Sequence, residues 1–182
     1  MSENNIHIVQ LSDYTTPEVT EEKNRDWIGY GEDNDYFEHL ISLSNSSPTN
    51  NAIINGMVDI IYGGGLDAKD KARKPDEYAM MMSIFKRDDV YRVVADLKLM
   101  GNASMQVIYS KDKSRIIRVE HFPVETLRAT KADEDGKVEK YAYCSDWSKV
   151  KRNTELDFIP AFGCGGKNEL IEILYIKPYK SG

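Results

Sequence analysis

The sequence predicts an α+β fold, with a helical amino-terminal half followed by an antiparallel β-rich half. Between residues 32 and 101 apolar side chains recur at helical spacing, whereas from Asn102 onward they alternate with polar ones, as in half-buried strands. Helices and strands are also segregated along the chain, which argues against a doubly wound fold. We therefore expect an extended arm and linker over 1–31, a helical segment over 32–101 and a β-hairpin-rich segment over 102–182.

The arm begins with Ile6 to Leu11, whose alternation is typical of a short strand or an extended segment. A polar run follows from Thr15 to Arg25. Because this run contains Pro17 and lacks apolar spacing, we expect it to be flexible. The stretch from Trp27 to Asn34 is rich in turn-forming residues and holds two aromatic side chains.

The first helix is predicted to begin at Asp35, which stands three residues before Glu38 in the spacing of a capping box, and to end near Ser44. The residues of its buried stripe are Phe37, Leu40 and Ile41. The second helix is predicted to begin at Ser47–Pro48, an N-cap followed by proline, and to end at Gly63–Gly65. Its apolar residues at helical spacing are Ile53, Ile54, Met57, Val58 and Ile61.

Pro75 is predicted to open a further helical stretch, with a break or a solvated turn at Lys86–Asp89. We interpret the run Met80–Met82 as core filling, because methionine adapts to irregular gaps. The two apolar stripes of this stretch are Tyr78, Met81, Met82 and Phe85, and then Val90, Tyr91, Val94 and Leu97.

The β-rich half is predicted to contain two hairpins followed by two short strands. Lys111–Ser114 is the expected turn of the first hairpin and Asp133–Gly136 that of the second. The expected strands are the alternating residues up to Tyr109, then Ile116–Phe122, Leu127–Lys131, Lys137–Cys144, Leu156–Phe162 and Leu170–Ile176.

Composition narrows the class of protein. The 182 residues include 24 Lys and Arg against 30 Asp and Glu, so the net charge is −6, which argues against a protein that grips phosphates through a basic patch. Hydrophobic residues make up 41% and charged residues 30%, as in ordinary globular chains. No apolar run approaches the roughly 18 residues of a membrane span, and the first residues do not resemble a secretory signal. We expect a soluble, cytoplasmic chain with no membrane partner.

Metal-site patterns are missing from the sequence. Cys144 and Cys164 form no CxxC pair, and His7, His39 and His121 are scattered, so we expect two ordinary thiols, with a disulfide left open, and no zinc. In an EF-hand alignment of Asp133–Gly136, the first and last positions would fall on Lys131 and Ala142, which are not acidic. Turn formation and helix capping also account for Glu32, Asp33 and Asp35. No metal and no cofactor are expected.

The stretch from Ala161 to Asn168 partly matches the phosphate-binding loop GxxxxGK[ST]. Its matching residues are Gly163, Gly165, Gly166 and Lys167. Ala161 replaces the first glycine, and Asn168 replaces the hydroxyl that would coordinate magnesium, so a glycine-rich hairpin or surface loop is the favoured interpretation. A nucleotide-binding enzyme that uses this degenerate loop is kept as an alternative. Because there is also no GxSxG nucleophile motif, we predict no catalytic residues and no enzymatic activity.

Several stretches, taken in order, resemble the amino-terminal portion of tailed-bacteriophage portal proteins, the head-tail connectors. They are 27–36, 40–43, 51–56, 61–65, 101–109, 119–128, 143–147 and 158–162. The residues that carry the resemblance are Trp27, Tyr30, Gly31, Asn34, Asn51, Ile53, Asn55, Gly56, Gly63, Gly65, Gln106, His121, Arg128, Asp146, Trp147, Pro160 and Phe162. Members of the family more often have a proline where this chain has Phe37.

The resemblance implies a structural subunit without enzymatic activity, found in phages and prophages. Portal proteins assemble as a ring, typically a dodecamer, at one vertex of the capsid, and double-stranded DNA is packaged and ejected through the channel of this ring. The partners implied are further copies of the chain, the terminase large subunit, capsid and scaffold proteins, and the head-tail adaptor. The implied location is the virion, and the host cytoplasm during assembly.

Family members are longer than this chain, so the resemblance implies an amino-terminal fragment that corresponds mainly to the wing region. We expect the isolated fragment to be a monomer or a weak oligomer. An acidic channel wall would let DNA slide without the phosphate contacts that hold it, so no tight DNA binding is expected. A stand-alone protein-interaction module is the third interpretation.

Overall fold

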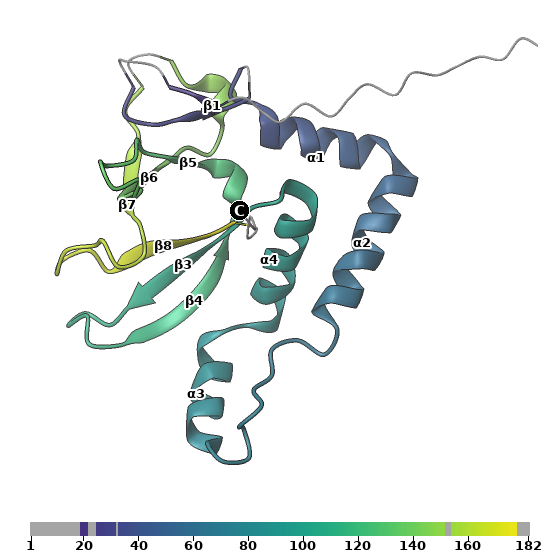
Figure 1. Ribbon diagram of the computed structural model, residues 1–182, viewed down its shortest axis with the longest axis vertical. Coiled ribbons are helices and arrows are strands. Elements are labelled where there is room, and N and C mark those ends of the chain that lie inside the picture. Colours follow the sequence, from purple (N-terminus) through teal and green to yellow (C-terminus); the bar gives the residue numbers. More distant parts are fainter. Residues whose placement is uncertain (1–18, 22–24, 32, 152–153, 178–182) are drawn as a thin grey trace, which may run out of the picture.

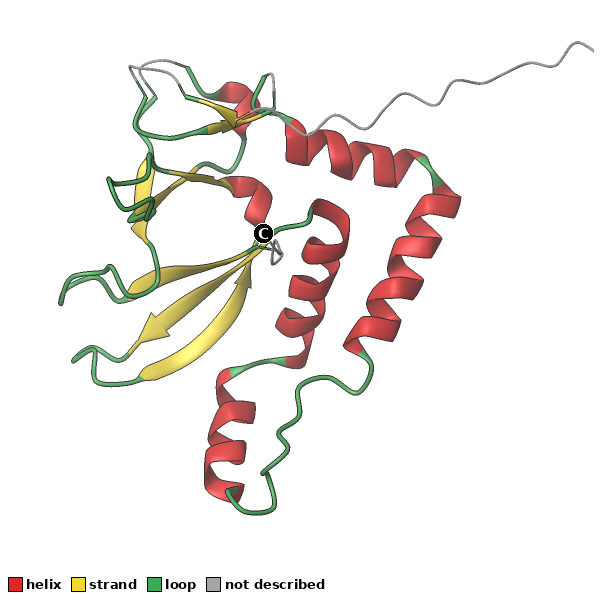
Figure 2. Ribbon diagram, viewed as in Figure 1, coloured by secondary structure: helices red, strands yellow, loops and turns green. Residues whose placement is uncertain are grey.

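The computed structural model describes residues 19–21, 25–31, 33–151 and 154–177, and within them the fold is α+β, as predicted. Four helices and eight strands are present in the described residues, and the strands form three sheets in which all paired strands are antiparallel. The four helices lie on one side and most strands on the other (Figure 2), and along the chain the helices precede most of the strands. The exception is the pair β1 (Val19–Thr20) and β2 (Gly29–Tyr30), which lies before the first helix.

The helices form a layer beside the sheets. They are α1 (Tyr36–Ser46), α2 (Pro48–Tyr62), α3 (Pro75–Ile84) and α4 (Arg87–Met100). Figure 1 shows α4 between α2 and the strands β3 and β4, so that α2 forms the outer edge of the molecule. The predicted start of α2 is confirmed, because the Ser47 hydroxyl accepts a hydrogen bond from the Asn50 N–H at 3.4 Å.

Two three-stranded sheets make up the β-rich half. The first has the order β4 (Ile116–Phe122), β3 (Ala103–Tyr109), β8 (Ile171–Ile176), and the second has the order β5 (Leu127–Ala129), β6 (Lys140–Tyr143), β7 (Asp157–Pro160). Both predicted hairpins are therefore present. Short 3₁₀ turns η1 (Val124–Thr126) and η2 (Trp147–Lys149) flank the second sheet.

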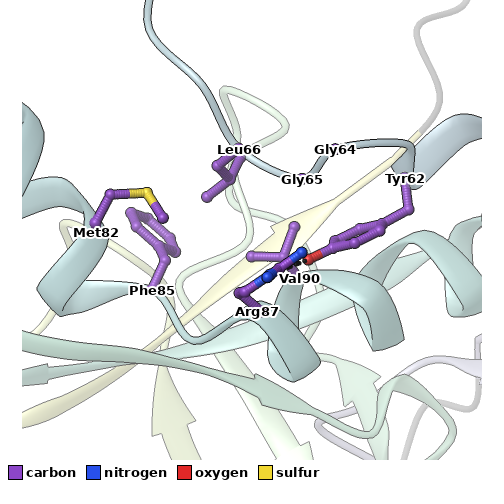
Figure 3. A pocket seen from close by; sticks show the side chains of 8 residues that line it. All are labelled: Tyr62, Gly64, Gly65, Leu66, Met82, Phe85, Arg87 and Val90. Atoms are coloured by element: carbon purple, nitrogen blue, oxygen red, sulfur yellow. Dashed lines mark hydrogen bonds between the residues drawn. The ribbon is translucent and has the colours of Figure 1, made fainter. Parts of the chain in front are cut away.

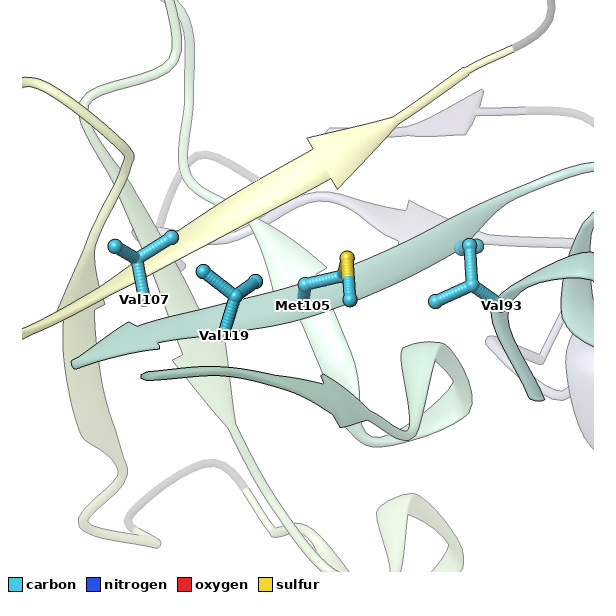
Figure 4. Close-up of a cluster of buried hydrophobic side chains, with 5 residues drawn as sticks. Val93, Met105, Val107 and Val119 are labelled. Carbon is cyan, nitrogen blue, oxygen red and sulfur yellow. The ribbon is translucent and has the colours of Figure 1, made fainter. Parts of the chain in front are cut away.

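The largest buried cluster lies where α4 crosses the first sheet (Figure 4). Val93 of α4 packs against the inward-facing residues of β3 and β4, and the members are Val93, Ala103, Met105, Val107 and Val119. Val107 and Val119 are direct partners across the two strands. Each buried Val or Met side chain of this cluster contributes about 1.5 to 3 kcal/mol through the hydrophobic effect, so the cluster fixes α4 on the sheet.

Several predictions about helix faces are wrong. Asp35 precedes α1 but makes no side-chain capping bond, so the predicted capping box is not formed. In α2 only Val58 is buried, whereas the predicted stripe residues Ile53, Met57 and Ile61 are exposed. The run Met80–Met82 was expected to fill the core, but Met80 and Met82 are exposed. In α4 the buried apolar residues are Val93 and Met100, which are not in the predicted stripe.

The linker predicted up to residue 31 also differs from the structure. Its first 18 residues, including the strand predicted at Ile6 to Leu11, lie outside the described residues. The described part pairs Val19 with Tyr30, and the Ile28 N–H donates to the Ala129 carbonyl at 2.9 Å. Residues 27–31 therefore pack on the β-rich half.

Candidate functional site

A buried junction joins the amino-terminal segment to the second sheet, and we call its residues Trp27, Asn34, Arg128 and Trp147 the Arg128 junction. Trp27 is held next to β5 by an isolated bridge to Thr130. Its ring lies 4.8 Å from that of Trp147 in the η2 turn. The guanidinium of Arg128 lies 4.7 Å from the centre of the Trp147 ring, so the junction combines a cation with the face of an aromatic ring.

Arg128 is only 2% exposed, and each nitrogen of its guanidinium has an acceptor. Nε donates to the Asn34 side-chain oxygen and Nη2 to the Asn34 backbone carbonyl, the latter at 2.8 Å. Nη1 donates to the carbonyls of Glu125 and Leu127 at 2.8 and 2.9 Å. The side chain thus connects residues 94 positions apart in sequence.

The charge of Arg128 is balanced within the chain, which indicates a structural role for this side chain. Burial lowers the pKa of Arg128, and the carboxylate of Glu38, 3.6 Å from Nη2, opposes that change. Asn34 has a left-handed backbone (φ 61°), a conformation that asparagine tolerates, and its side chain also accepts from the Tyr30 N–H at 3.1 Å. Four of the five guanidinium N–H groups donate hydrogen bonds within the chain, and the Glu38 carboxylate lies 3.6 Å from Nη2, so a phosphate would have to compete with a carboxylate for this side chain.

A second buried polar cluster lies next to the segment that partly matches a phosphate loop. The carboxylate of Glu172, on β8, is 1% exposed and accepts from Lys113 Nζ at 2.8 Å and from the Tyr109 hydroxyl at 2.9 Å. Burial raises the pKa of Glu172, but hydrogen bonds from the Gly163 N–H, Lys113 and Tyr109 outweigh this effect and hold it below its usual value. Burial together with Glu172 raises the pKa of Tyr109 to about 12.

Backbone groups of the degenerate phosphate loop are hydrogen-bonded to side chains of the same chain. The Gly163 N–H donates to Glu172 at 2.9 Å, and the Gly166 N–H donates to Glu169 at 2.6 Å. The carbonyls of Gly165 and Gly166 accept from Lys113, so it is their oxygens that face a cation. The segment joins β7 to β8 and no helix follows it within the described residues. Two amides that would cradle a phosphate are therefore used by carboxylates.

A small hollow lies between the end of α2, α3 and the start of α4 (Figure 3). Its interior has a volume of about 20 Å³, about the room that one water molecule needs. The Tyr62 ring lies on one side and Phe85 on the other, and Arg87 Nε donates to the Tyr62 hydroxyl at 3.5 Å. The remaining lining residues are Gly64, Gly65, Leu66, Met82 and Val90. The hollow is far smaller than a nucleotide site.

The residues that carry the portal resemblance lie partly around the Arg128 junction and partly in three other places. Seven lie in or next to the Arg128 junction, and they are Trp27, Tyr30, Gly31, Asn34, Arg128, Asp146 and Trp147. The others lie on or just after α2 (Asn51, Ile53, Asn55, Gly56, Gly63, Gly65), in the first sheet (Gln106, His121) and at the end of β7 (Pro160, Phe162). His121 Nε2 pairs with Asp96 at 2.7 Å, and Gln106 donates to Glu120 at 3.1 Å.

Several exposed apolar residues lie along one side of α2, and we call this surface the α2 outer face. Its residues are Ile53, Gly56, Met57, Ile60 and Ile61. Ile60 is 81% exposed, the largest value among the bulky apolar residues described. A helix that turns both an inner and an outer apolar stripe is typical of a protein that packs against more than its own core.

Sequence reasoning missed the Lys113–Glu172 pair and the role of Arg128 as a connection. A signal was present in both cases. Glu172 and Arg128 are charged residues inside apolar strands, and they lie next to the buried residues Ile173 and Leu127 in the sequence. In the described part of the chain, no group of three or more His, Cys, Asp and Glu side chains is placed to hold a metal ion. No described helix is long and apolar enough to cross a membrane.

The sequence matches no protein-family model, and no curated protein shows significant similarity to it. The portal resemblance thus rests on the order of the quoted stretches, and it stays a prediction.

Proposed function

We propose that this chain is a structural subunit of the portal ring of a tailed bacteriophage, in its wing region, and that double-stranded DNA passes through the ring during packaging and ejection. The observation that supports the proposal most is the α2 outer face. Four bulky apolar side chains of this 15-residue helix, Ile53, Met57, Ile60 and Ile61, are exposed, and Val58 is its one buried residue. Such a surface is expected of a subunit that packs beside neighbours.

The contacts inside the protomer support a scaffold. In both the Arg128 junction and the Glu172 cluster, internal hydrogen bonds link segments that are far apart in sequence, and such links stiffen the chain. A ring subunit that carries load needs this rigidity. The proposed partners are those of the family: neighbouring copies, the terminase large subunit, capsid and scaffold proteins and the head-tail adaptor. The net charge of −6 suits a wall along which DNA slides.

Electron microscopy tests the proposal. The reading frame that contains these 182 codons, expressed to its stop codon, is expected to give closed rings with a central channel. A purified product that is only monomeric would contradict it. The isolated chain is expected not to bind duplex DNA at sub-micromolar concentration in physiological salt. For the nucleotide-binding alternative, ATP is titrated against the chain and against Lys167→Ala, and saturable binding that the substitution abolishes would favour that alternative.

A further inference from the structure

Exposed apolar side chains lie on two opposite flanks of the protein. One flank is the α2 outer face, and the other is the β7–β8 segment, which exposes Phe158, Phe162 and Ile171. Figure 1 shows α2 at one edge of the molecule and the β7–β8 connection at the opposite edge, with α4 and the first sheet between them. Two unlike surfaces on opposite sides are the arrangement that a head-to-tail contact between copies requires.

The sequence of α2 has a feature that its own protomer does not explain. Gly56 lies in the helix interior, where glycine is destabilising relative to alanine, yet a Cβ at this position would meet nothing within 4 Å. The only charged residue of α2 is Asp59, whose carboxylate accepts from the Tyr91 hydroxyl at 2.8 Å. A glycine in an uncharged apolar stripe allows another backbone to approach closely.

The two flanks also differ in charge. The α2 outer face holds no charged residue. Residues 154–171 carry one cation, Lys167, and the carboxylates Glu155, Asp157 and Glu169, all exposed, for a net charge of 1 − 3 = −2. Like charges therefore disfavour contact between two β7–β8 segments, whereas the uncharged α2 outer face does not repel that segment.

We propose that the α2 outer face of one copy packs against the β7–β8 segment of a second copy of this chain, with Ile60 and Phe162 at the contact. This inference rests on the proposed function, since it names the surfaces through which neighbours in the ring would meet. The contact is weak in isolation. A 15-residue helix is about 22 Å long, and one helix face falls short of the roughly 800 Å² per partner of a standard interface. Ring closure would strengthen the contact by making it multivalent.

Sedimentation velocity of the 182-residue chain, up to about 1 mM, tests the contact. The wild-type chain is expected to associate as concentration rises. Ile60→Asp and Phe162→Asp are each expected to weaken association at least about tenfold. An equal mixture of the two variants is expected to form one-to-one pairs, because each variant keeps the flank that the other has lost. Circular dichroism of each variant checks that the fold is retained.

Matched controls place the same charge outside the apolar surfaces. Ala52→Asp lies on the side of α2 that carries Asp59, seven residues later in the sequence, and Ile117→Asp lies on β4, away from both flanks. Both are exposed, and both are expected to associate as the wild type does.

Four outcomes overturn the inference. The first is a wild-type chain that stays monomeric at the highest concentration, and the second is a mixture of the two variants that fails to form pairs. Loss of association in Ile60→Asp but not in Phe162→Asp would assign α2 to a symmetric contact with another α2. Equal loss in the two controls would show a general effect of charge. None of these results decides the proposed function, which depends on whether the full reading frame forms rings.

Discussion

The Arg128 guanidinium is buried and each of its nitrogens donates a hydrogen bond, whereas the apolar side chains of the α2 outer face are exposed to solvent. Arg128 is 2% exposed and bonds to three other residues through four hydrogen bonds, while Ile60 is 81% exposed. The two regions are therefore expected to have different roles. The junction stabilises the folded chain, and removing its groups should lower the free energy of unfolding. The α2 outer face is exposed, so changing it should affect the stability of the chain little, and under the proposed contact it should alter association instead.

The largest expected effect comes from Arg128→Ala. The substitution leaves the carbonyls of Asn34, Glu125 and Leu127 without this donor and opens a cavity beside Trp147, so the free energy of unfolding should fall by about 3 to 5 kcal/mol. Urea denaturation followed by circular dichroism measures it. Arg87→Ala, which removes an exposed arginine, is the control and should change stability by about 0.5 kcal/mol or less. A loss below about 1 kcal/mol for Arg128→Ala would remove the junction from the comparison.

Glu172→Gln should have the next largest effect, about 2 to 3 kcal/mol. In the wild type one carboxylate oxygen accepts from Lys113, and the other accepts from Tyr109 and from Gly163. An amide replaces one of these acceptors with a donor, so a donor faces a donor in either orientation. Exposed Glu169→Gln, which keeps an oxygen for its single bond from Gly166, is the control and should lose less.

The effect of Glu172→Gln should also depend on pH. Because the pKa of Glu172 is lower in the folded chain than in the unfolded one, its contribution is complete above the unfolded value, about 4.3. That contribution is lost as pH falls through the lowered folded value. The difference in stability between wild type and variant should therefore be constant from pH 7 to about 5 and should shrink below about pH 4. A difference that stays constant down to pH 2 would contradict the ionised form of the carboxylate.

Local signals predicted much of the fold. Ser47–Pro48 and the glycines after Tyr62 determine the two ends of α2 through backbone chemistry alone, and the prediction of both ends is confirmed. The hairpin turns at 111–114 and 133–136 were predicted for the same reason, since turn residues act over a few positions. The predicted Asp35 cap is not formed, because a capping residue needs an extended backbone, whereas Asp35 has φ −111° and ψ 8°.

Long-range partners could not be predicted. The periodicity of α2 reports every apolar residue, but Val58 faces α4 while Ile53 and Ile60 face solvent, and only the tertiary structure distinguishes them. The pairing of Asn34 with Arg128, and of Lys113 with Glu172, depends on sheets assembled from distant strands. The residues of the portal resemblance include Asn34 and Arg128, but the resemblance did not indicate that they are in contact.

Gly56→Ala sharpens the comparison with an effect of opposite sign. Alanine favours helix over glycine by about 1 kcal/mol and its Cβ meets nothing here, so the free energy of unfolding should rise by about that amount. Thermal denaturation at low concentration measures it. Gly101→Ala is the control, because the left-handed backbone of Gly101 (φ 70°) makes alanine destabilising there. Should Gly56→Ala lower stability, Gly56 would have a role inside the protomer.

The smallest expected effect is that of Ile60→Gln. Glutamine is a good helix former, and Ile60 is exposed, so the free energy of unfolding should change by about 0.5 kcal/mol or less. Val58→Gln, two residues earlier, is the matched control. Val58 is 1% exposed, and an amide buried there should cost about 3 kcal/mol or more. Similar losses for the two variants would mean that the α2 outer face is buried within the protomer in solution, and the contrast with the Arg128 junction would then fail.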